Sequence, residues 1–416
     1  MLNISEKLHS NKTFQENLRP ATLCRNLIIL DLLLILFSPA LSNLIEIIIF
    51  SLFLFSLKLR RKFLDNYNQP LFRASILFII IIICSSFWSI APINTALQEL
   101  WGWRKILLLP ISLALFQKIE DKERAINALL FFSIFACFLS YLSISEIFLS
   151  EKAGIMLRHH AFQGMVFSII VIIFVKKLLF SYAALNYKKK IIYTFFSIIF
   201  AINVLVGIGR SGYLILAVMM VMLFINYLRE SKYEHKKKIS IFVLCLVSIS
   251  LILSTQVRER IALGIDEIKS AYYLENDGNT SMGLRANTIL KTSQVIKENM
   301  LFGVGNGGFE TAIRNLNQTE DQRKIIFHDP HNQYLKIWAE FGLIGLSSFI
   351  YLLISAFKQK KMANEYSYYK YNFKLLGLIV LIGWIFTSIF SSHFSTFSEG
   401  RFIYLWIGIM LAFKEE

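Results

Sequence analysis

Long apolar runs, separated by short clusters of charged residues, occupy nearly the whole chain. Most of these runs have about 15 to 23 residues, which approaches the length that a helix needs to cross a hydrocarbon core of ~30 Å. The pattern therefore predicts an all-α integral membrane protein with about 12 transmembrane helices. The expected spans are 25–39, 41–57, 71–90, 104–117, 125–147, 162–180, 190–207, 211–228, 239–254, 337–357, 373–391 and 400–413.

One long segment, 255–336, interrupts this pattern between spans nine and ten. It carries ten basic and ten acidic side chains, and its periodicity predicts helices at 257–273 and 284–299. The chain is thus expected to form one integrated membrane domain in three parts. Spans one to nine with an N-terminal tail occupy 1–254, a mainly helical loop subdomain occupies 255–336, and spans ten to twelve occupy 337–416.

The distribution of charge predicts the orientation of these parts. The net charge is +16, and 28 of the 44 Lys and Arg residues lie in segments expected to face one side, against 6 in the short segments of the other side. Short basic loops stay in the cytoplasm, so both termini are expected to be cytoplasmic and the long loop external. The basic clusters would meet membrane lipids, and no nucleic acid is needed to explain them. The tail 1–25 has no cleavage signal and is expected to be retained.

Composition adds two exclusions. A chain that is 55% hydrophobic and 17% charged is neither a soluble multi-domain protein nor a disordered one. The four cysteines lie in the N-terminal tail or inside apolar runs, so neither a disulfide nor a zinc or redox site is predicted. No cofactor is expected.

The strongest chemical signal is a pair of histidines just before span ten, in the sequence His328-Asp329-Pro330-His331. Asp329 is a good N-cap and Pro330 suits the first helical position, so His331 is predicted in the first turn of a long helix. There the helix dipole disfavours the imidazolium form, which favours His331 as a general base. The alternative is that His328 and His331 are interfacial polar residues that cap the helix.

Two arginines are candidates for binding phosphate. Arg210 lies in a glycine-rich hinge between spans seven and eight, and Arg285 lies at the start of the second loop helix. An arginine fork binds phosphate with two hydrogen bonds, so a lipid-linked phosphate is a natural partner. The alternatives are a boundary arginine that reaches the membrane surface for Arg210 and a solvated helix face for Arg285.

Several external residues are further, weaker candidates for substrate binding. They are Arg104, Lys105, Arg158 and His393. An aromatic belt next to Arg104 and Lys105 explains both without a substrate. The neighbouring pair His159-His160 could suggest a metal, but no third ligand is evident. No metal site is therefore predicted.

A glycine-rich stretch at 302–309 completes the set of motifs. Its glycines allow a tight turn and the close approach of the backbone to a ligand or to another helix. It follows no predicted strand, so a dinucleotide site or P-loop is not indicated.

These features together resemble the O-antigen ligase and polymerase superfamily. The resemblance rests on the twelve expected spans, the arginine hinge, Gly283-Leu284-Arg285, the glycine-rich stretch and the His-Asp-Pro-His-Asn that enters a helix. The block 283–345 is its most specific part, and 87–92 also fits ligase-like members. It implies a bacterial inner-membrane glycosyltransferase of GT-C-like architecture with a periplasmic active site.

The resemblance also implies the reaction and the residues. A glycan would move from undecaprenyl pyrophosphate to a sugar hydroxyl of lipid A-core. His331 matches the essential histidine of the family, Arg210 and Arg285 match its two essential arginines, and the role of His328 stays open. Positioned proton transfer and preorganised positive charge are the chemistry that such a displacement needs, and a metal-independent, inverting displacement is expected.

Three alternatives remain open from the sequence. The nearest is an O-antigen polymerase, which would use another lipid-linked repeat as its acceptor. A protein O-oligosaccharyltransferase is the second. A secondary transporter is the third, because Asp31 and Glu46 lie inside apolar runs, where a charged group is costly. No internal repeat of the kind found in transporters is evident.

Overall fold

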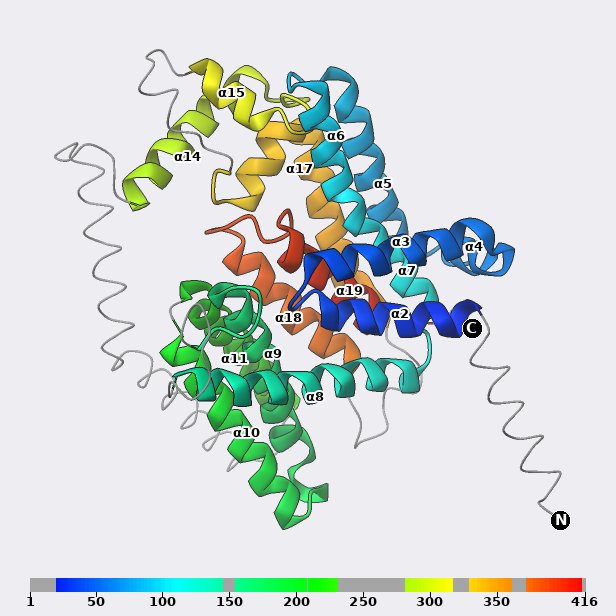
Figure 1. The fold of residues 1–416 in the computed structure, drawn as a ribbon, viewed down its shortest axis with the longest axis vertical. Helices are drawn as coiled ribbons and strands as arrows, with labels where there is room; N and C mark the ends of the chain where they lie inside the picture. The colour runs from blue at the N-terminus through cyan, green and yellow to red at the C-terminus, as the bar shows by residue number, and fades with distance from the viewer. Residues whose placement is uncertain are drawn as a thin grey trace.

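The computed structural model describes residues 20–144, 154–207, 209–230, 281–316, 329–360 and 372–413. All regular secondary structure in these ranges is helical (Figure 1). The elements are α2 (Pro20–Leu34), α3 (Pro39–Phe55), α4 (Leu57–Leu64), α5 (Pro70–Ser85), η1 (Ser86–Trp88), α6 (Ile93–Trp103), η2 (Arg104–Leu107), α7 (Leu108–Leu115), α8 (Ile119–Ile144), α9 (His160–Ser181), η3 (Tyr182–Ala184), α10 (Tyr187–Val206), α11 (Arg210–Glu230), α14 (Ser281–Glu298), α15 (Phe309–Leu316), α17 (Gln333–Lys358), α18 (Phe373–Thr387) and α19 (Phe397–Leu411).

Several of these helices are long and apolar enough to cross a membrane. In the described ranges there are six: Pro70–Trp88, Ile119–Ile144, His160–Ser181, Tyr187–Val206, Ser211–Arg229 and Gln333–Lys358. The bent pair of α3 and α4 would raise that number to seven if it is one span. The protein is thus built as a multi-pass membrane protein, and the finer expectation of twelve spans stays a prediction. The expected span 239–254 and loop helix 257–273 lie outside the described residues.

The helices pack into two neighbouring groups around α18 and α19. On one side α9 packs against both α10 and α11, and α11 packs on α18 (Figure 1). On the other side α5 packs along α17, which also contacts α14 and α15. We call the end of the bundle where α9, α11, α17 and α19 begin the site end.

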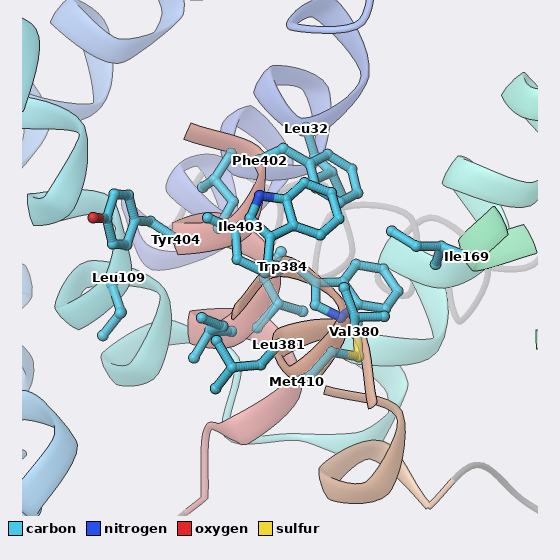
Figure 2. Packing of buried hydrophobic residues seen from close by; sticks show 14 of the residues in the cluster. Leu32, Leu109, Ile169, Val380, Leu381, Trp384, Phe402, Ile403, Tyr404 and Met410 are labelled. Carbon is cyan, nitrogen blue, oxygen red and sulfur yellow. The ribbon is translucent and has the colours of Figure 1, made fainter. Parts of the chain in front are cut away.

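Helix α19 occupies the centre of the core. Its residues are buried along the whole length, and α19 packs on α7 and α18. Trp384 of α18 stacks on Phe402 of α19 with 5.7 Å between ring centroids (Figure 2). Phe402 stacks in turn on Trp406 at 5.9 Å. A helix fixed in this way holds the polar residues of its first turn, at the site end, in defined positions.

A buried network of charges ties α2, α3 and η2 to α19. Arg401 forms ion pairs with Glu46 and, at 3.7 Å, with Asp31. Arg104 Nη2 lies 2.7 Å from the same Glu46 carboxylate, and the Asn43 side-chain oxygen accepts hydrogen bonds from both arginines. Two cations therefore face two anions. Removing one partner of such a buried pair typically costs about 3–5 kcal/mol, so this network fixes the site end of α19.

The glycine-rich stretch packs its backbone against a break in α17. Gly342 has a φ of +66°, which interrupts the helix, and the groups freed there bond to the stretch: Val304 N donates to Ala339 O and Leu343 N donates to Met300 O, both at 2.9 Å. A β-carbon on Gly303 would lie 2.5 Å from the backbone of Glu340. Gly303, Gly305 and Gly307 have φ values of +69°, +84° and +74°, so the structure shows both the expected turn conformation and the close approach to another helix.

Candidate active site

His331 lies just outside α17 and not in its first turn. The N-cap of α17 is Asn332, whose side-chain oxygen accepts hydrogen bonds from two backbone N–H groups at 3.0 and 3.1 Å. The predicted cap at Asp329 is therefore wrong, and Pro330 is not the first helical residue. Asparagine caps a helix as well as aspartate does, and Asp329 instead accepts a hydrogen bond from His331 N at 2.6 Å.

The backbone of His331 is strained. Its φ is +53°, and it is the one non-glycine residue with a positive φ in the described part of the chain. The left-handed region costs a residue with a β-carbon roughly 1–2 kcal/mol. Such a conformation persists where the surroundings fix it, and strained residues cluster at functional sites. The His331 side chain is exposed, so a substrate can reach it.

The loop 388–396 between α18 and α19 holds the His331 segment in place. Ser392 Oγ donates to Asp329 Oδ1 at 2.8 Å, which is the same oxygen that accepts the hydrogen bond from His331 N. The fully buried Gln333 accepts from the backbone N–H groups of Phe394 and Ser395, both at 2.9 Å. The conformation of His331 is therefore set by contacts on both sides of it.

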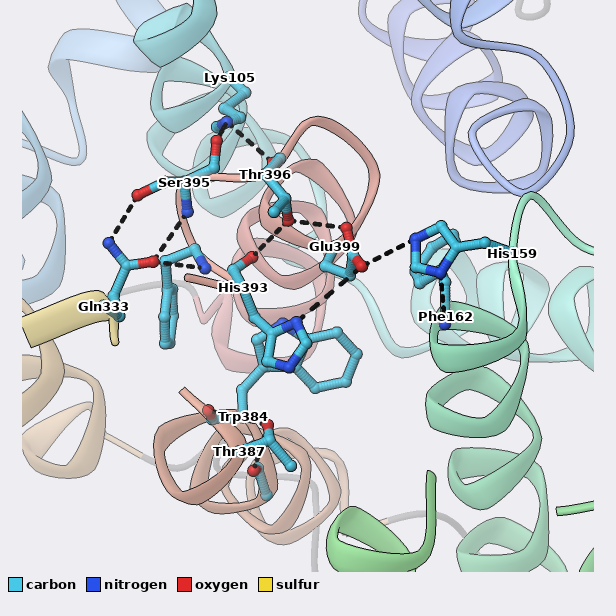
Figure 3. Close-up of polar contacts among 12 residues, drawn as sticks. Lys105, His159, Phe162, Gln333, Trp384, Thr387, His393, Ser395, Thr396 and Glu399 are labelled. Carbon is cyan, nitrogen blue, oxygen red and sulfur yellow. Dashed lines mark hydrogen bonds and ion pairs between the residues drawn. The ribbon is translucent and has the colours of Figure 1, made fainter. Parts of the chain in front are cut away.

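Two buried lysines reinforce this junction. Lys336 Nζ lies 3.7 Å from Asp329 Oδ2. Lys105 Nζ donates hydrogen bonds to the carbonyl oxygens of Ser395 and, at 2.9 Å, Thr396 (Figure 3). The candidate Lys105 is only 3% exposed, so the structure shows it bonded to the protein backbone at the base of the loop that holds His331.

A carboxylate between two histidines extends the polar cluster toward α9 (Figure 3). Glu399 Oε1 lies 3.0 Å from His159 Nε2 and 3.9 Å from His393 Nδ1, and Thr396 Oγ1 donates to Glu399 Oε2 at 2.7 Å. Burial alone would raise the pKa of Glu399, but the hydrogen bond that it accepts from His159, together with the charge that His159 and His393 carry when protonated, lowers it to about 2. The two histidines therefore favour the carboxylate form of Glu399.

The other two members of this cluster differ from each other. His159 caps α9, because its Nδ1 accepts a hydrogen bond from Phe162 N at 3.3 Å. His393 is buried, and neither ring nitrogen has a hydrogen-bond partner among the described residues. Burial lowers the pKa of His393, and the charge of Glu399 opposes that shift. The structure therefore places the candidate His393 beneath the surface.

Arg210 begins α11 at the same end, beside the start of α9. Gly209 lies against the backbone of His160 and Ala161, where a β-carbon would come within 3.0 Å. One turn further, Gly212 of α11 meets Gly164 of α9 so closely that a β-carbon on Gly164 would lie 2.9 Å from the Gly212 Cα. These glycines fix the start of α11 next to His159. His159 in turn contacts Glu399 of α19, which links the start of α11 to the loop that holds His331.

The remaining candidates lie as follows. Arg285 is in the second turn of α14, and His328 lies outside the described residues. Arg104 is paired with Glu46 within the protein. Arg158 is exposed, and its backbone N–H donates to Leu36 O. Within the described ranges, no group of three or more His, Cys, Asp or Glu side chains is arranged to hold a metal ion.

Sequence reasoning overlooked Glu399 and Gln333. Both are polar residues at the first turn of an apolar helix, which is also where ordinary capping residues occur. The only signal was the position of a carboxylate at the start of an expected span. The partners of Glu399 lie far away in the sequence, so no local pattern could reveal the cluster.

A family model described as O-antigen ligase matches residues 195–350. The predicted resemblance is confirmed. The match runs from α10 into α17 and contains Arg210, Arg285 and His331. It indicates a function of the O-antigen ligase or polymerase type, which is a glycosyltransferase-like activity on lipid-linked glycans.

A second comparison extends the similarity beyond that region. An uncharacterized protein of Haemophilus influenzae is 26% identical over 317 residues, which cover 72% of this chain and 75% of that protein. The similarity to that protein thus reaches outside the part that the family model matches.

Proposed function

We propose that this protein is an O-antigen ligase that transfers a glycan from undecaprenyl pyrophosphate to a sugar hydroxyl of lipid A-core. The reaction takes place at the site end, on the periplasmic face of the bacterial inner membrane. The single observation that carries the proposal is the strained, exposed His331, held by Asp329 at the same end of the bundle as Arg210. The family match, which contains both residues, supports it.

The proposed chemistry is one displacement at the anomeric carbon. His331 accepts the proton of the acceptor hydroxyl, and the acceptor oxygen forms a bond to the anomeric carbon on the face opposite the leaving group. The bond from that carbon to the diphosphate oxygen breaks, and the diphosphate leaves with the electron pair. The configuration is inverted. A positioned base contributes roughly 10²–10⁴-fold to such a reaction.

Arg210 and Arg285 are proposed to hold the departing diphosphate. Each guanidinium can bind two phosphate oxygens at once, and fixed positive charge at the leaving group is usually the larger contribution to rate. Arg210 stands at the N-terminus of α11, where the helix dipole also favours an anion. With two arginines on the diphosphate, a divalent cation is not required.

The test is a gel profile of surface lipopolysaccharide from a deletion strain, complemented with wild type or His331→Ala, together with an analysis of undecaprenyl-linked glycans. Bare lipid A-core with long chains left on the lipid carrier is the expected result for the deletion. His331→Ala, present at normal levels, should fail to complement. Core that carries a single repeat would show a polymerase instead, which the family match also allows. An unchanged profile would overturn both assignments in favour of protein glycosylation or transport.

A further inference from the structure

An apolar groove lies beside α3, and His331 is not part of its lining. Its volume is about 650 Å³, and side chains of α3, α4, α6, η2 and α7 form its walls. Phe50, Leu54, Phe63 and Ile111 are among these residues, and the one charged residue in the lining is Arg60. The groove therefore offers an apolar channel with a cation in its wall.

The two ends of the groove differ in charge. At the site end lies Trp101, whose ring is covered by the Arg104 guanidinium at 4.2 Å. That guanidinium is already paired with Glu46. At the opposite end lies Arg60, which is exposed and has no ion pair with any described carboxylate. An anionic group can thus be attracted to the Arg60 end.

Helix α4, which carries Arg60, has the geometry of a helix that lies along a membrane surface. It turns by 90° from α3, and its sequence LKLRRKFL contains four cations and no acidic residue. Its one buried residue is Leu59. Basic residues near an anionic leaflet are attracted to it, and α4 places several such cations beside the groove.

We propose that this groove binds an acyl chain of an anionic phospholipid, whose phosphate lies on Arg60. This inference goes beyond the proposed transfer reaction and does not depend on it. Helix α3 has 17 residues, which corresponds to roughly 25 Å and separates Arg60 from the site end. A donor whose diphosphate lies beside His331 would have its charged group far from Arg60. The charge at α4 therefore favours a lipid of the leaflet next to α4.

Arg60 and Arg61 form a matched pair for a test. They are neighbours on α4, both exposed and equal in charge, but only Arg60 lines the groove. Adjacent helical residues point about 100° apart. The full-length protein in detergent is titrated with phosphatidylglycerol and with phosphatidylcholine of the same acyl chains, and native mass spectrometry counts the bound lipids.

The expected result is one phosphatidylglycerol molecule that binds about fivefold or more tightly than phosphatidylcholine. Arg60→Gln should abolish that preference, and Arg61→Gln should keep it. Ser51→Phe, which fills the groove from α3, should weaken binding of both lipids. If Arg60→Gln and Arg61→Gln reduce the preference for phosphatidylglycerol equally, general surface charge explains the binding and the proposed site is wrong. If undecaprenyl phosphate competes for the groove more effectively than phosphatidylglycerol does, the groove binds the polyprenyl chain instead.

Discussion

The strain at His331 gives a prediction that separates function from stability. Glycine adopts a positive φ freely, whereas alanine in the left-handed region pays roughly 1–2 kcal/mol. His331→Gly should therefore be more stable than His331→Ala by about 1 kcal/mol, after the greater entropy of glycine in the unfolded chain is subtracted. Both variants lose the imidazole. Both should lose transfer activity by roughly 10²-fold or more.

The assay combines transfer by purified protein with thermal melting. The melting temperature of His331→Gly should exceed that of His331→Ala by on the order of 1–2 °C, because the shift per kcal/mol falls with chain length. If His331→Gly keeps more than a tenth of the wild-type activity, His331 is not the general base. If the glycine variant is less stable than the alanine variant, the positive φ at residue 331 does not carry the expected energetic cost.

Four further predictions concern the residues around this base. Arg210→Lys should lose at least tenfold in turnover, because a point charge cannot replace the two-pronged guanidinium; near-normal turnover would argue against diphosphate binding there. Asp329→Ala should lower kcat more than Asp329→Asn does, since the amide oxygen still accepts from His331 N; equal rates for the two variants would rule out that positioning role. Excess chelator should leave transfer unchanged, and loss that added Mg²⁺ restores would show that a metal is needed. The folded state holds His393 neutral at a lowered pKa, so its contribution to stability is present above pH ~6.5 and is lost on acidification below that value; His393→Gln should flatten the fall in melting temperature between pH 7 and 5, and an unchanged fall would assign it elsewhere.

The helical fold follows closely from the pattern of apolar runs. The described helices α9, α10 and α11 each lie within three residues of an expected span, and α8 begins six residues before its span. The agreement arises because the length and composition of a run suffice to predict a membrane helix. The break in α17 at Gly342 did not follow. A helix can be interrupted there only because the backbone of residues 300–305 supplies the missing hydrogen bonds, and that pairing is not visible in either segment alone.

The candidate site was accessible from the sequence only where its chemistry was local. His331 and its neighbours form one short motif, so the sequence singled out the histidine, although it misassigned the cap of α17. Glu399 and His159 lie about 240 residues apart in the sequence, and their contact at 3.0 Å depends on how α9 packs beside α19. Periodicity fixes which face of a helix is buried, but not which polar residues meet at helix ends.

The position of Glu399 gives a reason for the central place of α19. The proposed base belongs to the segment before α17, and the proposed diphosphate ligand Arg210 belongs to the start of α11. These are different helix groups, and chemistry requires their separation to be held within a fraction of an ångström. Glu399 bridges them through His159, and Arg401, two residues further on, is anchored by Asp31 and Glu46. The buried carboxylates that suggested transport thus have a structural explanation, because they fix the helix on which both halves of the site depend.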